Sequence, residues 1–83
     1  MMNALSNSQI DEAILSVTVT SWRKVARVIV MTDKILGDSL PEGEPGLDLV
    51  ADRIASLIHD GRLMAQGDIR KWRYSEVRKP DSN

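Results

Sequence analysis

The sequence predicts an α+β domain in which three helices are followed by a two-stranded β-hairpin. Three stretches carry apolar residues at helical spacing, and after Gly61 the pattern changes to the alternation that is typical of strands. The chain has 83 residues, of which 42% are hydrophobic and 28% charged, a length and composition that suit one hydrophobic core. We expect a single domain over residues 9–78, with flexible termini at residues 1–8 and 79–83.

The first predicted helix starts after Ser8, where apolar residues recur at helical spacing. Its N-terminal cap is either Ser6 with Gln9 or Ser8 with Asp11. The β-branched residues 17–20 end the helix in an extended connection or a very short strand.

The second helix is predicted over residues 22–36, with Ser21 as its N-cap and Gly37 as its stop. Apolar side chains cover well over half of its circumference, so we expect it at the centre of the domain. Asp33 falls within the apolar arc, where it either pairs with an arginine from elsewhere or lies at a solvated helix end. The remaining polar stripe carries Arg23, Arg27 and Lys34.

Residues 37–46 are rich in glycine, proline and acidic residues and predict an exposed loop. A third helix with the most regular amphipathic pattern follows from Leu47 and stops at Gly61.

Residues 63–66 and 72–77 alternate like the two strands of a hairpin. An isolated hairpin is marginally stable, so we expect this one to rest on the helices through Leu63 and Val77. The predicted core consists of Ile10, Ile14, Trp22, Val25, Ala26, Ile29, Leu36, Val50, Ala51, Ile54, Leu57, Ile58 and Leu63.

Three helices and then a hairpin is the element order of a winged helix-turn-helix domain. One departure is the ten-residue connection between the second and third helices, because a tight helix-turn-helix uses about three or four residues. The connection therefore does not fit the standard docking geometry on DNA.

Three segments carry a resemblance to a known family: W-R-K-V-A-R-V at 22–28, G-R-L-M-A-Q-G-D at 61–68 and Y-S-E-V-R at 74–78. Together with the first helix they resemble, over residues 11–78, a bacterial domain family of unknown function that occurs alone or at the C-terminal end of longer proteins. The resemblance implies a winged-helix-like fold and assigns no catalytic or binding residue. It also implies that this chain is a free-standing copy of a module that elsewhere is attached to other domains.

Composition excludes several classes of protein. The net charge is −1 and cysteine is absent, which argues against a basic nucleic-acid tail, a disulfide scaffold and cysteine-based chemistry. The longest apolar run has four residues, whereas a membrane span needs about 20. The first residues lack the basic and apolar regions of a secretion signal. We therefore expect a cytoplasmic protein that does not bind a membrane.

Charge is segregated along the chain. Residues 37–60 hold six acidic side chains and one basic one, whereas residues 22–36 and 61–83 each carry a net charge of +3. A winged helix presents its third helix to DNA, where phosphates require cations, so this acidic helix should repel DNA.

Segregated charges favour an interaction module, and we expect either self-association as a homodimer or binding to a protein partner of complementary charge. The alternative is that Arg53 and Arg62 simply neutralise aspartates at the same helix end. The expected partner-binding face consists of Asp48, Leu49, Asp52, Arg53, Ser56 and His59.

A nucleic-acid-binding transcriptional regulator that contacts DNA through its basic wing is the alternative function. Trp72 and Tyr74 fall on one face of the second predicted strand, where they either stack on a base or ribose or cover the helices. The neighbouring basic side chains then contact phosphates or form only a solvated rim. The candidate nucleic-acid contacts are Arg23, Arg27, Arg70, Lys71, Trp72 and Arg73.

Catalysis has the weakest support. His59 is the single histidine and shares a helix face with Asp48 and Asp52, a combination that a proton relay or a partial metal site would use. No nucleophile motif or phosphate-binding glycine loop accompanies these residues. We expect a non-catalytic protein with no cofactor, no metal and no small-molecule substrate.

Overall fold

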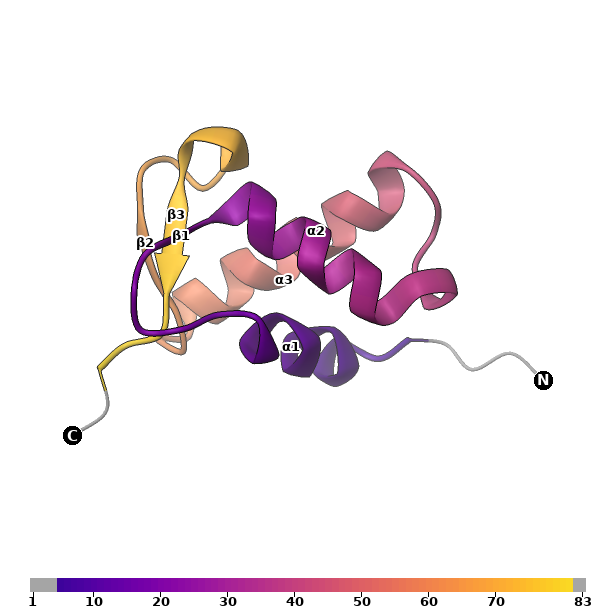
Figure 1. Cartoon of the computed structure of the whole chain (residues 1–83), viewed down its shortest axis with the longest axis horizontal. Helices are drawn as coiled ribbons and strands as arrows, with labels where there is room; N and C mark the ends of the chain where they lie inside the picture. The colour runs from indigo at the N-terminus through magenta and orange to yellow at the C-terminus, as the bar shows by residue number, and fades with distance from the viewer. Residues whose placement is uncertain (1–4, 82–83) are drawn as a thin grey trace.

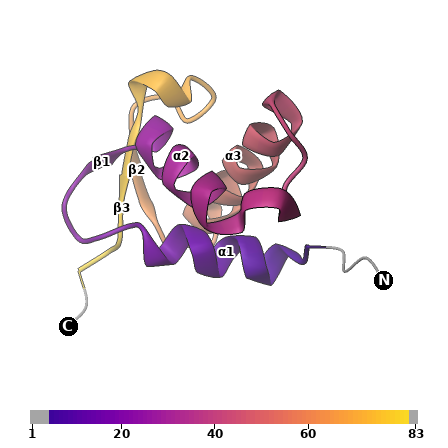
Figure 2. The same cartoon turned by 45° about the vertical axis from the view of Figure 1, so that its right-hand side comes forward.

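The computed structural model describes residues 5–81 and has the α+β architecture that the sequence predicts. The helices and strands are α1 (Asn7–Ser16), β1 (Arg23–Lys24), α2 (Val25–Leu36), α3 (Glu44–His59), β2 (Met64–Gln66) and β3 (Glu76–Arg78). Two short 3-10 helices, η1 (Gly37–Ser39) and η2 (Trp72–Tyr74), lie in the connections. The three helices contact one another, and the small sheet stands at the end where α2 begins (Figure 1). In the turned view, α1 runs below both other helices (Figure 2).

β3 is the central strand of the sheet and pairs antiparallel with β1 on one side and β2 on the other. Within it, Val77 lies opposite both Arg23 and Ala65. The β2–β3 pair confirms the predicted hairpin, although both strands are shorter than the pattern indicates. β1 was not predicted. Three helices with an antiparallel sheet in this order are compatible with a winged-helix-like fold.

α2 begins at Val25, later than predicted, and Ser21 does not cap it. The residues before Val25 are extended because they pair with β3 as β1, and the Val25 amide donates to the Ser75 carbonyl at 3.0 Å. A hydrogen-bonded strand therefore replaces the first turn of the predicted helix. Gly37 ends α2, as predicted.

α1 begins at Asn7 rather than after Ser8, and its cap is the first of the two predicted alternatives. The Gln9 amide donates to Ser6 Oγ at 3.1 Å, and the Ser6 amide donates to Gln9 Oε1 at 2.8 Å. This reciprocal capping box satisfies two backbone donors and starts the helix early. Residues 17–20 form the connection towards β1, and none of them belongs to a strand.

The predicted loop over residues 37–46 is shorter in the structure, because it contains η1 and the first turn of α3. α3 begins at Glu44, since an acidic residue and Pro45 both suit the first turn of a helix. Gly46 lies in that turn close to the preceding connection. A side chain at this position would collide with the carbonyl oxygen of Pro41, so the close approach requires glycine.

Asp33 lies half-buried in the last turn of α2. It belongs to none of the ion pairs that residues 5–81 form. It lines an open hollow of about 470 Å³ beside the connection from α2 to α3, together with Asp38 and Glu42. Of the two predicted alternatives, the solvated helix end is the one that the structure supports.

The core lies between the three helices and the inner face of the sheet. The predicted core residues that are buried are Ile10, Ile14, Val25, Ile29, Val50, Ile54, Leu57 and Leu63. Those that are partly buried are Ala26, Leu36, Ala51 and Ile58. Val77 is buried, as expected of an anchor of the hairpin. The core also includes Ala13, Val17, Val28 and Leu40.

Trp22 is the predicted core residue that the structure places at the surface. Its side chain is 39% exposed, and the guanidinium of Arg78 lies 5.2 Å from the centre of its ring. The prediction is wrong because residue 22 precedes β1 instead of occupying the first turn of α2. Its ring therefore lies at the surface beside Arg78 of β3 rather than filling the space between helices.

Substitutions at Trp22 and Ile54 should separate these two environments. We expect Ile54→Ala to lower the free energy of unfolding by about 2–5 kcal/mol, because Ile54 is fully buried in α3. Trp22→Ala should cost less, about 1–2 kcal/mol, because its ring is only partly covered and its contact with Arg78 is exposed to solvent. Urea unfolding followed by circular dichroism measures both values, and an equal loss in the two variants would contradict the surface position of Trp22.

Candidate interaction surface

The predicted partner-binding face of α3 divides into two parts in the structure. Asp48, Leu49, Asp52 and His59 are exposed, whereas Arg53 and Ser56 are partly buried. Arg53 is turned towards α1 and is not part of the free surface. The two parts therefore have different roles.

Arg53 forms a bidentate ion pair with Asp11 of α1. Its Nε donates to Asp11 Oδ1 and its Nη2 donates to Asp11 Oδ2, each at 2.9 Å. The two side chains are only 22% and 12% exposed, and the hydrogen bonds to Asp11 raise the pKa of the Arg53 guanidinium. Arg53 is therefore neutralised within the molecule, but its bonded partner lies on another helix, and Asp60 at its own helix end adds only a weaker attraction.

Asp11 is a structural residue that was predicted only as a helix-cap candidate. It is buried beside apolar positions of α1, where an unpaired carboxylate would be costly. One feature of the sequence could have indicated its burial, because this acidic side chain directly follows the core position Ile10. Its partner is 42 positions away and could not be identified from spacing.

A double-mutant cycle should measure this ion pair. We expect Asp11→Asn or Arg53→Gln to lower the free energy of unfolding by about 2 kcal/mol, because either change leaves a partly buried group without its charged partner. The double variant should lose less than the sum of the two single losses. Asp52→Asn, an exposed position on the same helix, is the control and should change stability by less than about 0.5 kcal/mol. Additive losses would show that the pair contributes nothing.

Two residues of the exposed part of the α3 face, Asp48 and Asp52, lie on one wall of a groove, whereas Leu49 and His59 lie outside it. The groove has a volume of about 370 Å³ and lies between α3 and the connection from β2 to β3. On the helix side, the small side chains of Ala51 and Ala55 leave space for the groove. The lining residues are Asp48, Ala51, Asp52, Ala55, Ile69, Arg70 and Trp72.

Opposite charges lie on the two walls of this α3 groove. Asp48 and Asp52 stand on the helix wall and Arg70 on the opposite wall. Neither aspartate takes part in an ion pair among the residues that the structure describes. Arg70 forms only a long contact of 3.4 Å from Nε to Asp68 Oδ1 and remains largely exposed. The walls therefore offer charges of both signs to a ligand.

Asp68 shapes the connection that carries Arg70. Its Oδ1 accepts a hydrogen bond from the Arg70 amide at 3.0 Å. That backbone hydrogen bond, with the guanidinium of the same residue, lowers the pKa of Asp68. Through this hydrogen bond the Asp68 side chain holds the start of the turn in place.

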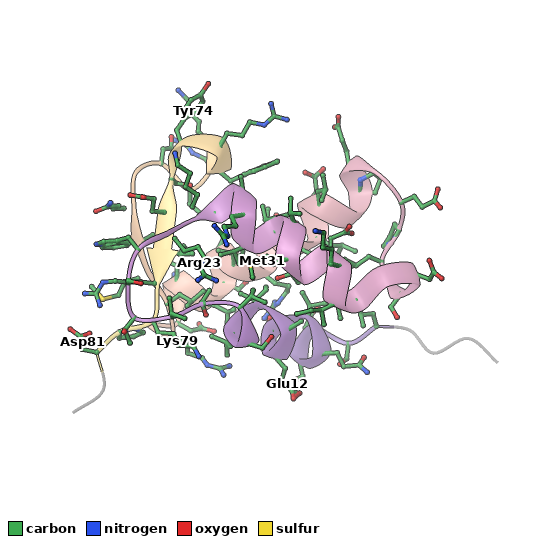
Figure 3. All side chains as sticks on the ribbon, viewed as in Figure 1. Glu12, Arg23, Met31, Tyr74, Lys79 and Asp81 are labelled. Carbon is green, nitrogen blue, oxygen red and sulfur yellow. The ribbon has the colours of Figure 1, made fainter. Side chains whose placement is uncertain are left out.

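Residues 70–74, which we call the basic turn, form a second surface feature. Trp72 and Tyr74 were predicted on one face of a strand, and this prediction is wrong because both belong to the 3-10 helix η2. Side chains of all five residues, Arg70, Lys71, Trp72, Arg73 and Tyr74, line a hollow of about 240 Å³. The Arg73 guanidinium lies 5.3 Å from the centre of the Trp72 ring. Figure 3 shows Tyr74 projecting from this turn away from the helices.

The two remaining candidates for nucleic-acid contact lie on the segment that forms β1 and α2. Arg23 is half-buried, and its Nη1 donates to the Val17 carbonyl at 2.9 Å and contacts Met31 Sδ at 3.8 Å. Figure 3 shows its side chain beside Met31, not with Tyr74. Arg27 is exposed on α2, the helix whose start adjoins η2. The structure therefore gathers four of the six predicted residues in one turn and gives Arg23 a structural contact.

His59 is exposed at the end of α3 and forms no hydrogen bond with Asp48 or Asp52. Among residues 5–81, no three histidine, aspartate or glutamate side chains come together in a group that could hold a metal ion. Within the same residues, no helix combines the length and apolar character that crossing a membrane requires.

Comparisons of the chain with family models, with curated proteins and with solved structures return no significant match. The resemblance to the bacterial domain family therefore stays a prediction, and function is inferred from the geometry of the surface.

Proposed function

We propose that this chain is a non-catalytic, winged-helix-like interaction module that pairs with a second copy of itself through the α3 groove. The observation that carries the proposal is the presence of opposite charges on the two walls of one groove with an apolar floor. The resemblance to a domain that is attached to other proteins also fits an interaction module.

The order of the elements supports the winged-helix assignment. The β2–β3 hairpin follows α3 directly and takes the position of a wing, while β1 joins the sheet ahead of α2. In this fold α3 would be the helix that enters the major groove of DNA. Its exposed Asp48 and Asp52 face the wing, which is where DNA phosphates would approach. The same fold is therefore better suited to a protein surface than to a duplex.

A two-fold pair would satisfy both walls of the groove at once. In such a pair the same patch faces itself in the opposite direction. The acidic wall of one copy then meets Arg70 of the other, and the second aspartate–arginine contact is equivalent by symmetry. The partly buried Ile69 and Trp72 would be covered in the same step, which adds apolar burial to the charge contacts.

Charge reversal tests the pairing. Sedimentation equilibrium of the wild-type chain should show a concentration-dependent dimer. We expect Asp48→Lys/Asp52→Lys and, separately, Arg70→Glu to weaken dimer formation by about tenfold or more, because each places like charges opposite one another. An equimolar mixture of the two variants should recover association, since the reversed walls are again complementary.

Glu12→Lys is the matched control, because Glu12 is an exposed acidic residue on α1 and lies outside the α3 groove. It should leave the dimer unchanged. A wild-type chain that remains monomeric up to millimolar concentration would overturn the proposal. Equal weakening by the control would show that net charge, rather than the groove, governs association.

A further inference from the structure

Tyr74 is the most exposed large hydrophobic side chain of the described residues, with 82% of its surface accessible. Its ring contributes nothing to the core, yet the backbone that carries it is firmly held. The Tyr74 amide donates to the Lys71 carbonyl at 2.8 Å, and the Lys71 amide donates to the Asp68 carbonyl at 2.9 Å. The next residue, Ser75, is buried and accepts the hydrogen bond from α2. The ring is thus presented to solvent on a fixed support.

Gly67 closes the other side of this support. It has a φ angle of 86°, and a side chain there would come within 2.9 Å of the Tyr74 carbonyl oxygen. Only glycine combines this backbone conformation with so close an approach. The chain before the basic turn therefore packs directly against its end and limits its movement.

Three exposed cations lie in the same short turn as Tyr74. Arg70, Lys71 and Arg73 share the hollow of the basic turn with it. The acidic residue Asp68 precedes the basic turn, and its carboxylate contacts Arg70. Lys71 and Arg73 belong to none of the ion pairs of residues 5–81. Their charges are therefore available to an anion.

We infer that the basic turn binds single-stranded nucleic acid, with an unpaired base stacked on Tyr74 and phosphates held by Lys71 and Arg73. Exposed aromatic rings beside cations are the combination that single strands require, since every base has a face for stacking. In a duplex the bases are already stacked. A duplex would also extend from the turn across α3, where Asp48 and Asp52 repel its phosphates.

This inference does not depend on the pairing of two copies. Lys71, Arg73 and Tyr74 line the hollow of the basic turn and do not line the α3 groove. A monomeric chain could therefore bind a single strand, and a chain that fails to do so could still pair.

The test compares strands with and without bases. Fluorescence anisotropy measures binding to a labelled oligothymidylate of about 12 nucleotides, a length chosen to cover a typical site. The abasic deoxyribose phosphate of the same length and a duplex of the same length are measured in parallel. We expect the oligothymidylate to bind about tenfold or more tightly than the abasic strand, the fold-change that corresponds to stacking of one base.

Substitutions in the basic turn show which residues produce the preference for the strand that carries bases. Tyr74→Ala should bind the two strands equally, whereas Tyr74→Phe should keep the preference because stacking requires the ring and not the hydroxyl group. Lys71→Gln and Arg73→Gln should each weaken binding to both strands. Each should also lower the slope of log affinity against log salt concentration by roughly 0.7. Lys34→Gln removes an exposed lysine near the far end of α2 and is the charge control. It should change neither the affinity for the strands nor its salt dependence. The exposed position of Tyr74 predicts that none of its variants loses thermal stability.

Several results would overturn the inference. Equal binding of abasic and thymidylate strands by the wild-type chain would show that the basic turn binds only phosphates and stacks no base. Tighter binding of the duplex would assign the turn to double-stranded DNA. A Tyr74→Ala variant that keeps the wild-type preference, or a chain that binds no strand at low salt, would remove the stacking site altogether.

Discussion

The backbone pairing of β3 is the constraint on which the rest of the structure depends. This strand of three residues lies between β1 and β2, so it joins the start of α2 to the segment that follows α3. Its central residue, Val77, is fully buried and anchors the sheet against the helices. The basic turn ends one residue before β3, and Ser75 between them accepts a hydrogen bond from the start of α2. Both candidate surfaces are therefore positioned by the same short strand.

Electrostatics divide the molecule into an inner and an outer set of charges. The bidentate pair of Asp11 and Arg53 joins α1 to α3 in a partly buried position, where its geometry satisfies both side chains. Arg53 is thereby withdrawn from the outer face of α3. The acidic side chains Asp48 and Asp52 remain exposed there, and three exposed cations lie on the basic turn. A net charge close to zero thus conceals two surfaces of opposite sign.

Local rules predicted much of the fold and less of the site. Interactions within a few residues determine the capping box at Ser6, the end of α2 at Gly37 and the hairpin after Gly61. The structure confirms these three features, although the bounds of the elements differ. β1 could not be predicted, because two residues that would otherwise continue a helix become extended only by pairing with β3, more than fifty positions away. Trp22 was misplaced for the same reason. The alternation over residues 72–77 could not distinguish a strand from a 3-10 turn, which depends on the contacts of Gly67 and Ser75.

Arg70 and Trp72 line both the α3 groove and the hollow of the basic turn. A second copy in the groove and a single strand on Tyr74, Lys71 and Arg73 would therefore both lie next to these two side chains. A partner that draws Arg70 towards the acidic wall removes one cation from the turn and should weaken phosphate binding there. By linkage, a strand that holds Arg70 in the turn weakens pairing by the same factor. Under the two proposals, occupancy of one surface would thus oppose occupancy of the other, with Arg70 as the shared charge.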